Sequence, residues 1–257
     1  MRIVTIATLT FKESVRQKVL YNLVVFALLL IGAAILFGSI SVGVEQIILI
    51  TLGLTSISVF GLLMAIFIGI ELVSKEIERR TIANVLSKPV SRPEFILGKY
   101  LGLLLTLLVN TAIMTAGFYA ALFYEQRTLG RGDLVYLGAI YFILLQLAMV
   151  VAIALVFSTI STPVLSAVYT FCLFVIGNLT PELRSLGGAT RSALVGTVSD
   201  ILYYALPNFG DFNVISQAAH GQGIPAYLWL GDTSYALLYI TALLGLAVLI
   251  FEEREFR

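Results

Sequence analysis

The sequence is poor in charge and in the residue types that build redox and metal sites. Only 16 Lys or Arg and 15 Asp or Glu occur among 257 residues, or 12%, about half the share of an ordinary soluble domain. Apolar residues make up 59%, more than a globular fold could hide from water, which excludes a water-soluble enzyme. The lone Cys172 and the lone His220 exclude a disulfide framework and a cysteine or histidine cluster for metal. A net charge of +1 excludes a basic surface for nucleic acid.

The sequence also lacks the motifs of two catalytic classes. It has no GxxxxGK[ST] loop, so it cannot cradle the phosphates of ATP by that route. It has no HExxH zinc motif, and no predicted membrane span contains a pair of acidic residues. An intramembrane protease or lipid transferase needs a nucleophile with a base, or a metal cage. We therefore expect no catalytic residues, no metal and no cofactor in this chain.

What the sequence has instead is long uncharged runs, at residues 19–44, 46–70, 100–124, 134–181 and 233–251. A helix needs about 20 apolar residues to cross the hydrocarbon core. Four runs therefore hold one span each, and the longest holds two, divided near Ser158–Pro163. The expected fold class is an all-α integral membrane protein with a single domain over residues 1–257. The six predicted spans are residues 20–41, 47–71, 97–123, 134–158, 163–180 and 233–251.

Two segments outside these spans are expected to form short helices. Apolar residues at near-helical spacing among the charges of residues 1–18 predict an amphipathic helix on the membrane surface, the alternative being a frayed tail. Residues 180–232 are weakly polar and rich in glycine, which predicts short or re-entrant helices between spans 5 and 6. The uncharged stretch 212–231 contains glycines and a proline, so it is rejected as a span, because its backbone groups would be unsatisfied in lipid.

The basic residues predict the orientation in the membrane. Six spans put both termini on one side, together with residues 71–99. That side carries twelve of the 16 Lys and Arg, and the other side carries four. Cytoplasmic loops carry the excess of Lys and Arg. We therefore expect a multi-pass protein of the cell (inner) membrane with both termini cytoplasmic.

The charged stretch of residues 71–99, between spans 2 and 3, has the pattern of two helices separated by a break. Pairs of opposite charge four residues apart support a helix that continues from span 2 into water. Pro89 and Pro93 break that helix, and Ser91 is placed to cap the next one, which leads into span 3. The first helix has too few apolar residues to form a core of its own, so these residues are placed to dock on a partner.

Three parts of this stretch carry a family resemblance: Glu76-x-Glu78-Arg79-Arg80-Thr81-Ile82, then Leu86-Ser87-Lys88-Pro89-Val90-Ser91-Arg92, then Gly98-Lys99. They resemble the signature of permease subunits of type-2 ABC transporters, closest to the branch for multicopper-enzyme maturation, such as that of nitrous oxide reductase. The resemblance covers the layout of the whole chain. It implies an exporter in which a coupling helix between spans 2 and 3 docks on a cytoplasmic ABC ATPase. It further implies a dimer of this chain with two ATPase copies that bind ATP and Mg, and it allows an extracytoplasmic accessory protein.

The resemblance assigns ATPase coupling to one set of residues, with the alternative that the stretch is an inert, solvated turn. Among them, we expect Glu78, Arg79 and Thr81 to dock, and Pro89 and Arg92 to shape the bend. The full set is Lys75, Glu76, Glu78, Arg79, Arg80, Thr81, Ile82, Leu86, Ser87, Pro89 and Arg92.

Polar residues within spans are few, and each has two interpretations. Asn110, Gln146 and Asn178 are candidates for a substrate path, the alternative being hydrogen bonds between helices. Small residues in spans 1 and 3 permit close helix approach, either at a dimer seam or within the subunit. The function alternative to transport is a membrane anchor, scaffold or mechanotransmitting subunit of a maturation complex.

Overall fold

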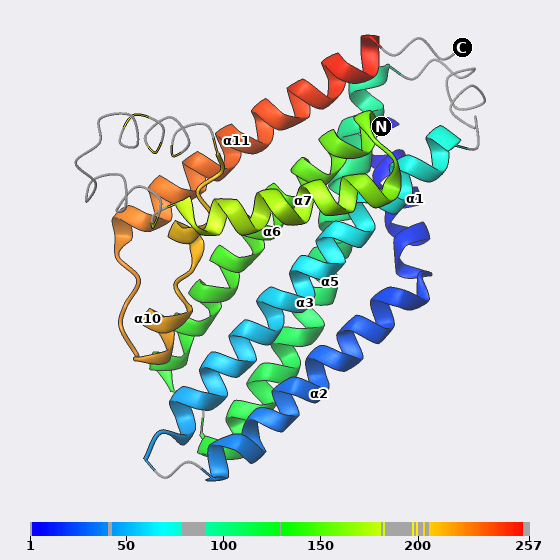
Figure 1. Cartoon of the computed structure of the whole chain (residues 1–257). Helices are drawn as coiled ribbons and strands as arrows, with labels where there is room; N and C mark the ends of the chain where they lie inside the picture. Colours follow the sequence, from blue (N-terminus) through cyan, green and yellow to red (C-terminus); the bar gives the residue numbers. More distant parts are fainter. Residues whose placement is uncertain are drawn as a thin grey trace.

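The structure is a computed structural model of the chain, shown in Figure 1. It describes residues 2–40, 43–78, 91–128, 130–180 and 206–253, together with residues 182, 197, 199 and 203. For residues 71–78, 131, 252 and 253 it describes the backbone only. All regular secondary structure in these ranges is helical. The elements are α1 (Arg2–Val15), α2 (Lys18–Ile40), α3 (Glu45–Glu78), α5 (Arg92–Gln126), η1 (Arg131–Asp133), α6 (Leu134–Ile160), α7 (Pro163–Asn178), η2 (Gly210–Phe212), α10 (Ile215–Ala219) and α11 (Ala226–Glu253).

Five of the described helices are long and apolar enough to cross a membrane. They are Lys18–Ile40, Glu45–Ile70, Arg92–Gln126, Leu134–Ile160 and Ala226–Phe251. Each overlaps a predicted span, because the charge-free runs supply the apolar part of each helix. The chain is therefore a multi-pass α-helical membrane protein.

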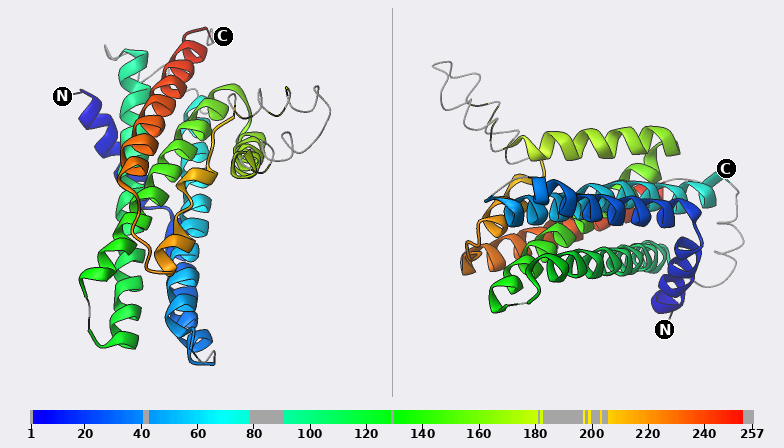
Figure 2. Two further views of the ribbon diagram at one scale, coloured as in Figure 1. Left: turned by 90° about the vertical axis from the view of Figure 1, so that its left-hand side faces the viewer. Right: turned by 90° about the horizontal axis from the view of Figure 1, so that it is seen from below.

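A sixth span, predicted over residues 163–180, stays a prediction, because the described helix there is shorter than these five. The helix predicted over 163–180 is α7, which has 16 residues, or about 24 Å at 1.5 Å per residue, against a hydrocarbon core of about 30 Å. In Figure 2 (left), α7 is seen nearly end-on while the other long helices run lengthwise, so it crosses them steeply. Helix α7 begins with Pro163 after the extended residue Thr162, as predicted from the sequence.

The last predicted span, 233–251, begins too late. Helix α11 begins at Ala226, so the end of the stretch 212–231 that was rejected as a span belongs to it. The error came from treating Asp232 as a boundary. Asp232 is instead inside the helix, where its side chain lines a cavity rather than facing lipid. A carboxylate is tolerated within a membrane helix when it faces the protein interior.

Helix α6 lies at the centre of the bundle, with α3, α5, α7 and α11 packed around it (Figures 1 and 2). It is the most buried of the five long helices. Two glycines of α3 let it approach α6 closely: a Cβ at Gly61 would lie 2.5 Å from Leu147 Cδ1, and one at Gly69 would lie 2.6 Å from Ala154 Cβ. Small residues at such contacts give the dispersion energy that holds membrane helices together.

The predicted N-terminal helix is present as α1, and it packs against α5. A Cβ at Gly98 would lie 2.7 Å from Ile6 Cβ, and one at Gly102 would lie 2.6 Å from Thr10 Cβ. The small residues of span 3 therefore serve internal packing. Gly32 of span 1, by contrast, has no atom within 4 Å of an added Cβ, so its face of α2 is open.

The described chain ends gather at one end of the bundle, where α5 begins and α11 ends (Figure 1). At the start of α5 the Ser91 backbone N–H donates to Glu94 Oε2 at 3.0 Å, as a capping box requires. Arg92 Nη1 donates to the Phe251 carbonyl at 3.3 Å. The Phe95 and Phe251 rings stack with centroids 5.8 Å apart. The first turn of α5 and the last turns of α11 are therefore directly joined.

Candidate functional site: a polar cavity beside an inserted loop

An irregular segment, residues 207–213, lies among α6, α7 and α11 at the level of the middle of α6. The Phe209 N–H donates to the Gly177 carbonyl at 3.0 Å, and Gln146 Nε2 donates to the Phe209 carbonyl at 3.4 Å. Gln146 lies about 18 Å along α6 from its first residue. Non-helical backbone at such depth requires partners of this kind. The short or re-entrant helices predicted between spans 5 and 6 stay a prediction; the described residues here form an inserted loop with one turn of 3-10 helix, η2.

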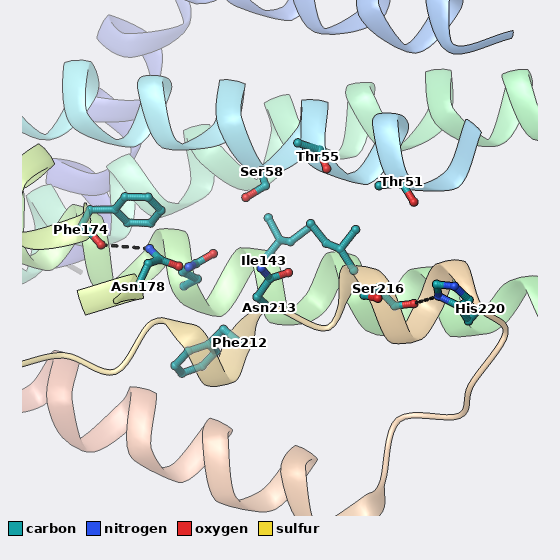
Figure 3. A pocket seen from close by; sticks show the side chains of 12 residues that line it. Thr51, Thr55, Ser58, Ile143, Phe174, Asn178, Phe212, Asn213, Ser216 and His220 are labelled. Carbon is teal, nitrogen blue, oxygen red and sulfur yellow. Dashed lines mark hydrogen bonds between the residues drawn. The ribbon is translucent and has the colours of Figure 1, made fainter. Parts of the chain in front are cut away.

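Beside this segment lies a cavity of about 490 Å³ (Figure 3). It is bounded by α3, by α6, by the end of α7 and by residues 212–220. Most of its lining side chains carry hydroxyl or amide groups, and none carries a fixed charge. The lining residues are Thr51, Thr55, Ser58, Ile143, Gln146, Phe174, Asn178, Phe212, Asn213, Ile215, Ser216 and His220.

The structure brings together two of the three predicted path residues. Gln146 and Asn178 both line the cavity, although Asn178 Nδ2 donates to the Phe174 carbonyl of its own helix at 3.0 Å. Asn110 does not line it, and its Nδ2 donates to the Thr106 carbonyl at 2.9 Å. For Asn110 and Asn178 these bonds lie within one helix, whereas Gln146 holds the inserted loop.

The predicted coupling residues are only partly described. Lys75, Glu76 and Glu78 belong to the last turns of α3, and their side chains are not described. Arg92 is described, and its bond to Phe251 fixes the start of α5. The remaining predicted coupling residues lie outside the described residues: Arg79, Arg80, Thr81, Ile82, Leu86, Ser87 and Pro89.

Sequence reasoning missed the hydroxyl stripe on α3. Thr51, Thr55 and Ser58 are spaced four and three residues apart, so they share one face of the helix, and Figure 3 shows them on the cavity side of α3. This spacing within a long apolar run was the available signal. The spacing alone does not indicate a path, because a hydroxyl in a membrane helix commonly bonds its own backbone, as Ser56 Oγ does to the Leu52 carbonyl at 2.6 Å.

His220 is the one imidazole at the cavity, and its Nδ1 lies 2.8 Å from the Ser216 carbonyl. Within the described ranges, no group of three or more His, Cys, Asp or Glu side chains could hold a metal ion. The lone Cys172 is exposed on α7.

Comparison with known proteins identifies the family. The family model described as "ABC-2 family transporter protein" matches residues 4–256, nearly the whole chain. No curated protein matches the sequence at a significant level. Members of this family are membrane subunits of transporters, generally not catalytic themselves, and membership implies an ABC ATPase partner and a dimeric arrangement. The chain thus belongs to the ABC-2 family of transporter proteins and is the transmembrane permease subunit of an ABC transporter.

Proposed function

We propose that the chain is half of the membrane part of an ATP-driven exporter, in which two copies pair with two ABC ATPase subunits and cargo passes through the polar cavity. The observation that supports this proposal is the cavity itself. A row of hydroxyl and amide groups around about 490 Å³ is unusual in a bundle whose lipid-facing surface is apolar. Polar groups inside a membrane protein mark substrate pathways.

The cavity lining favours a neutral polar or amphiphilic cargo. Thr51, Thr55 and Ser58 offer hydrogen bonds from one side, and Asn178 and Asn213 offer them from another. Within the described ranges no Lys, Arg, Asp or Glu lines the cavity, so an ionic cargo would be desolvated there without a counter-charge.

The ATPase is proposed to act on residues 75–92. The last turns of α3 extend beyond its apolar part, which ends at Ile70, and Arg92 joins the far side of this stretch to Phe251. ATP and Mg would be bound by the partner, and rigid-body motion of the helices would change the cavity. The end of the bundle with α1 and the end of α11 would face the cytoplasm of the cell (inner) membrane, since Arg2, Lys12, Arg16, Lys18 and Arg92 lie at that end of the described chain.

A second candidate function is mechanical transmission to an extracytoplasmic accessory protein, as a scaffold or anchor in a multicopper-enzyme maturation complex. The observation that favours it is the continuity of α11. This helix runs unbroken from Glu253 back to Ala226, so a displacement received at Phe251 would reach the other end of the bundle without passing through the cavity.

Native mass spectrometry of the complex, extracted with its partners in mild detergent, tests the proposed assembly. We expect a mass of two copies of this 28.0 kDa chain plus two copies of a soluble ATPase. A monomer or dimer without ATPase, under conditions that preserve a reference transporter, would contradict the proposal and favour the scaffold.

Cysteine labelling tests whether the cavity is a water-filled path. In a Cys172→Ala background, Thr55→Cys is expected to react several-fold faster with a membrane-impermeant thiol reagent than Val59→Cys, because a thiol needs water to ionise. Both positions are exposed on α3, but only Thr55 lines the cavity. The rate at Thr55 should also change when a transition-state analogue of ATP hydrolysis is bound. Equal, nucleotide-independent rates at both positions would contradict a transport path here.

A further inference from the structure

A second cavity, of about 360 Å³, lies on the other side of the inserted segment, between that segment and α11. Two carboxylates line it. Asp211 belongs to η2 and Asp232 to the second turn of α11. Asn208, Phe212 and Tyr235 line the same cavity, as does Tyr203. The cavity therefore contains a pair of acidic residues, Asp211 and Asp232. The sequence alone does not indicate this pair, because the two residues belong to different segments.

The orientation of Asn208 leaves an acceptor oxygen in this cavity without a partner. Asn208 Nδ2 donates to Asp211 Oδ2 at 2.5 Å. A carboxylate only accepts hydrogen bonds at neutral pH, so the amide nitrogen must face Asp211 and Oδ1 must face away from it. Asn208 is 7% exposed, and its Oδ1 is buried with no hydrogen-bond partner in the described part of the chain. Its backbone is fixed as well, since Asn208 N–H donates to the Tyr235 hydroxyl at 3.1 Å.

Asp232 adds a second such oxygen. Its Oδ2 is buried and also has no hydrogen-bond partner among the described residues. The two carboxylates lie within electrostatic reach of each other. Buried acceptors without donors are costly unless a ligand satisfies them, and among the described residues no Lys or Arg lines this cavity to offset the two acidic groups.

We propose that Asn208 Oδ1, Asp211 and Asp232 bind a hard cation, with Ca²⁺ as the ion that fits best. The metal ligands would be two carboxylates and an amide carbonyl. Ca²⁺ takes such oxygen ligands in irregular and flexible geometry, whereas Mg²⁺ demands a near-ideal octahedron. Among the residues that the structure describes, no thiol, thioether or imidazole lines the cavity, which disfavours the softer transition metals.

The ion would connect the inserted segment to α11. Asn208 and Asp211 come from the segment and Asp232 from the helix, so shared coordination would hold the two together. Phe212 lines both cavities, and the cation would therefore fix one wall of the polar cavity. This inference does not depend on transport, because binding can be measured on the purified chain alone.

Terbium luminescence tests the site directly. Tb³⁺ replaces Ca²⁺ at oxygen sites and is sensitised by nearby tyrosines, here Tyr235 and the adjacent Tyr239, whose ring centroids lie 5.7 Å apart. We expect saturable Tb³⁺ emission from the full chain in an uncharged detergent, displaced by Ca²⁺ with a dissociation constant of about 10⁻⁴–10⁻³ M and far less by Mg²⁺. Asp232→Asn should weaken binding about tenfold or more, since it removes one of two anionic ligands.

Glu125→Gln is the matched control, because it removes one acidic charge from an exposed position of α5 that does not line the cavity. It should bind as the unaltered chain does, and Ca²⁺ should raise the melting temperature of both but not of Asp232→Asn. If Asp232→Asn fails to fold, Asn208→Ala provides the same comparison. Absent emission, equal displacement by Ca²⁺ and Mg²⁺, or unchanged affinity in the cavity variants would overturn the proposal. A melting shift with n-butylammonium but not with Ca²⁺ would also overturn it, in favour of an organic cation.

Discussion

Reversing two charges of the coupling segment, Glu78→Lys with Arg79→Glu, is expected to release the ATPase from the permease. Removing one partner of a buried interfacial charge pair costs about 2–5 kcal/mol, and reversal adds repulsion to that loss. Since about 1.4 kcal/mol is a tenfold change in affinity, binding should weaken by about 10²–10³-fold. Co-purification of the tagged permease with its ATPase, followed by native mass spectrometry, measures the effect.

The matched control is Glu13→Lys with Arg16→Glu. Both residues are exposed, they lie at the same end of the bundle, and the pair undergoes the same charge changes outside the coupling segment. This variant should retain the ATPase. If both double variants lose it equally, or neither does, the docking role of residues 78 and 79 is wrong. Size-exclusion chromatography of the permease alone separates lost docking from lost folding.

Replacing Gly177 is expected to expel the inserted segment from the bundle. An added Cβ would overlap the Pro207 carbonyl and would lie 2.7 Å from Phe209 Cδ2. The same contact holds the hydrogen bond that the Phe209 N–H donates to the Gly177 carbonyl. Overpacking of this kind costs about 1–3 kcal/mol. Gly177→Ala should therefore lower the melting temperature, and Gly177→Leu should lower it further and expose residues 207–225 to proteolysis.

Gly231→Ala is the comparison for this effect. Gly231 also belongs to a helix, but no atom lies within 4 Å of an added Cβ, and alanine is the better helix former. It should leave the melting temperature unchanged or raise it. A Gly177→Ala protein as stable as Gly231→Ala would show that the segment does not need its contact with α7.

The positions of the long helices could be predicted from charge alone. A charged side chain is costly in the hydrocarbon core, so each uncharged run overlaps a long helix, although α3, α5 and α11 each extend seven or eight residues beyond their runs at one end. The break near Ser158–Pro163 could be predicted from backbone geometry, since proline fixes its own φ and favours the first helical turn. The pattern of residues 91–94 similarly indicated where α5 begins.

The sites were harder to predict, because they depend on which segments meet. Asp232 looked like the end of a span because its partners in the cavity, Asn208 and Asp211, belong to a loop whose path the sequence does not specify. Gln146 was identified as a polar residue within a span, but its bond to the Phe209 carbonyl depends on the same loop. The helical spacing of Thr51, Thr55 and Ser58 is visible in the sequence. That these side chains line a cavity depends on the residues of α6 and α7 opposite them, which the sequence does not place.

The bond between Arg92 and the Phe251 carbonyl joins residues 159 positions apart, and this separation bears on biosynthesis. A chain is made from its N-terminus, so the start of α5 enters the membrane long before residue 251 exists. Until translation is nearly finished, this bond and the stacking of Phe95 on Phe251 cannot form. A truncated or stalled product would thus lack the link between the first turn of α5 and the end of α11.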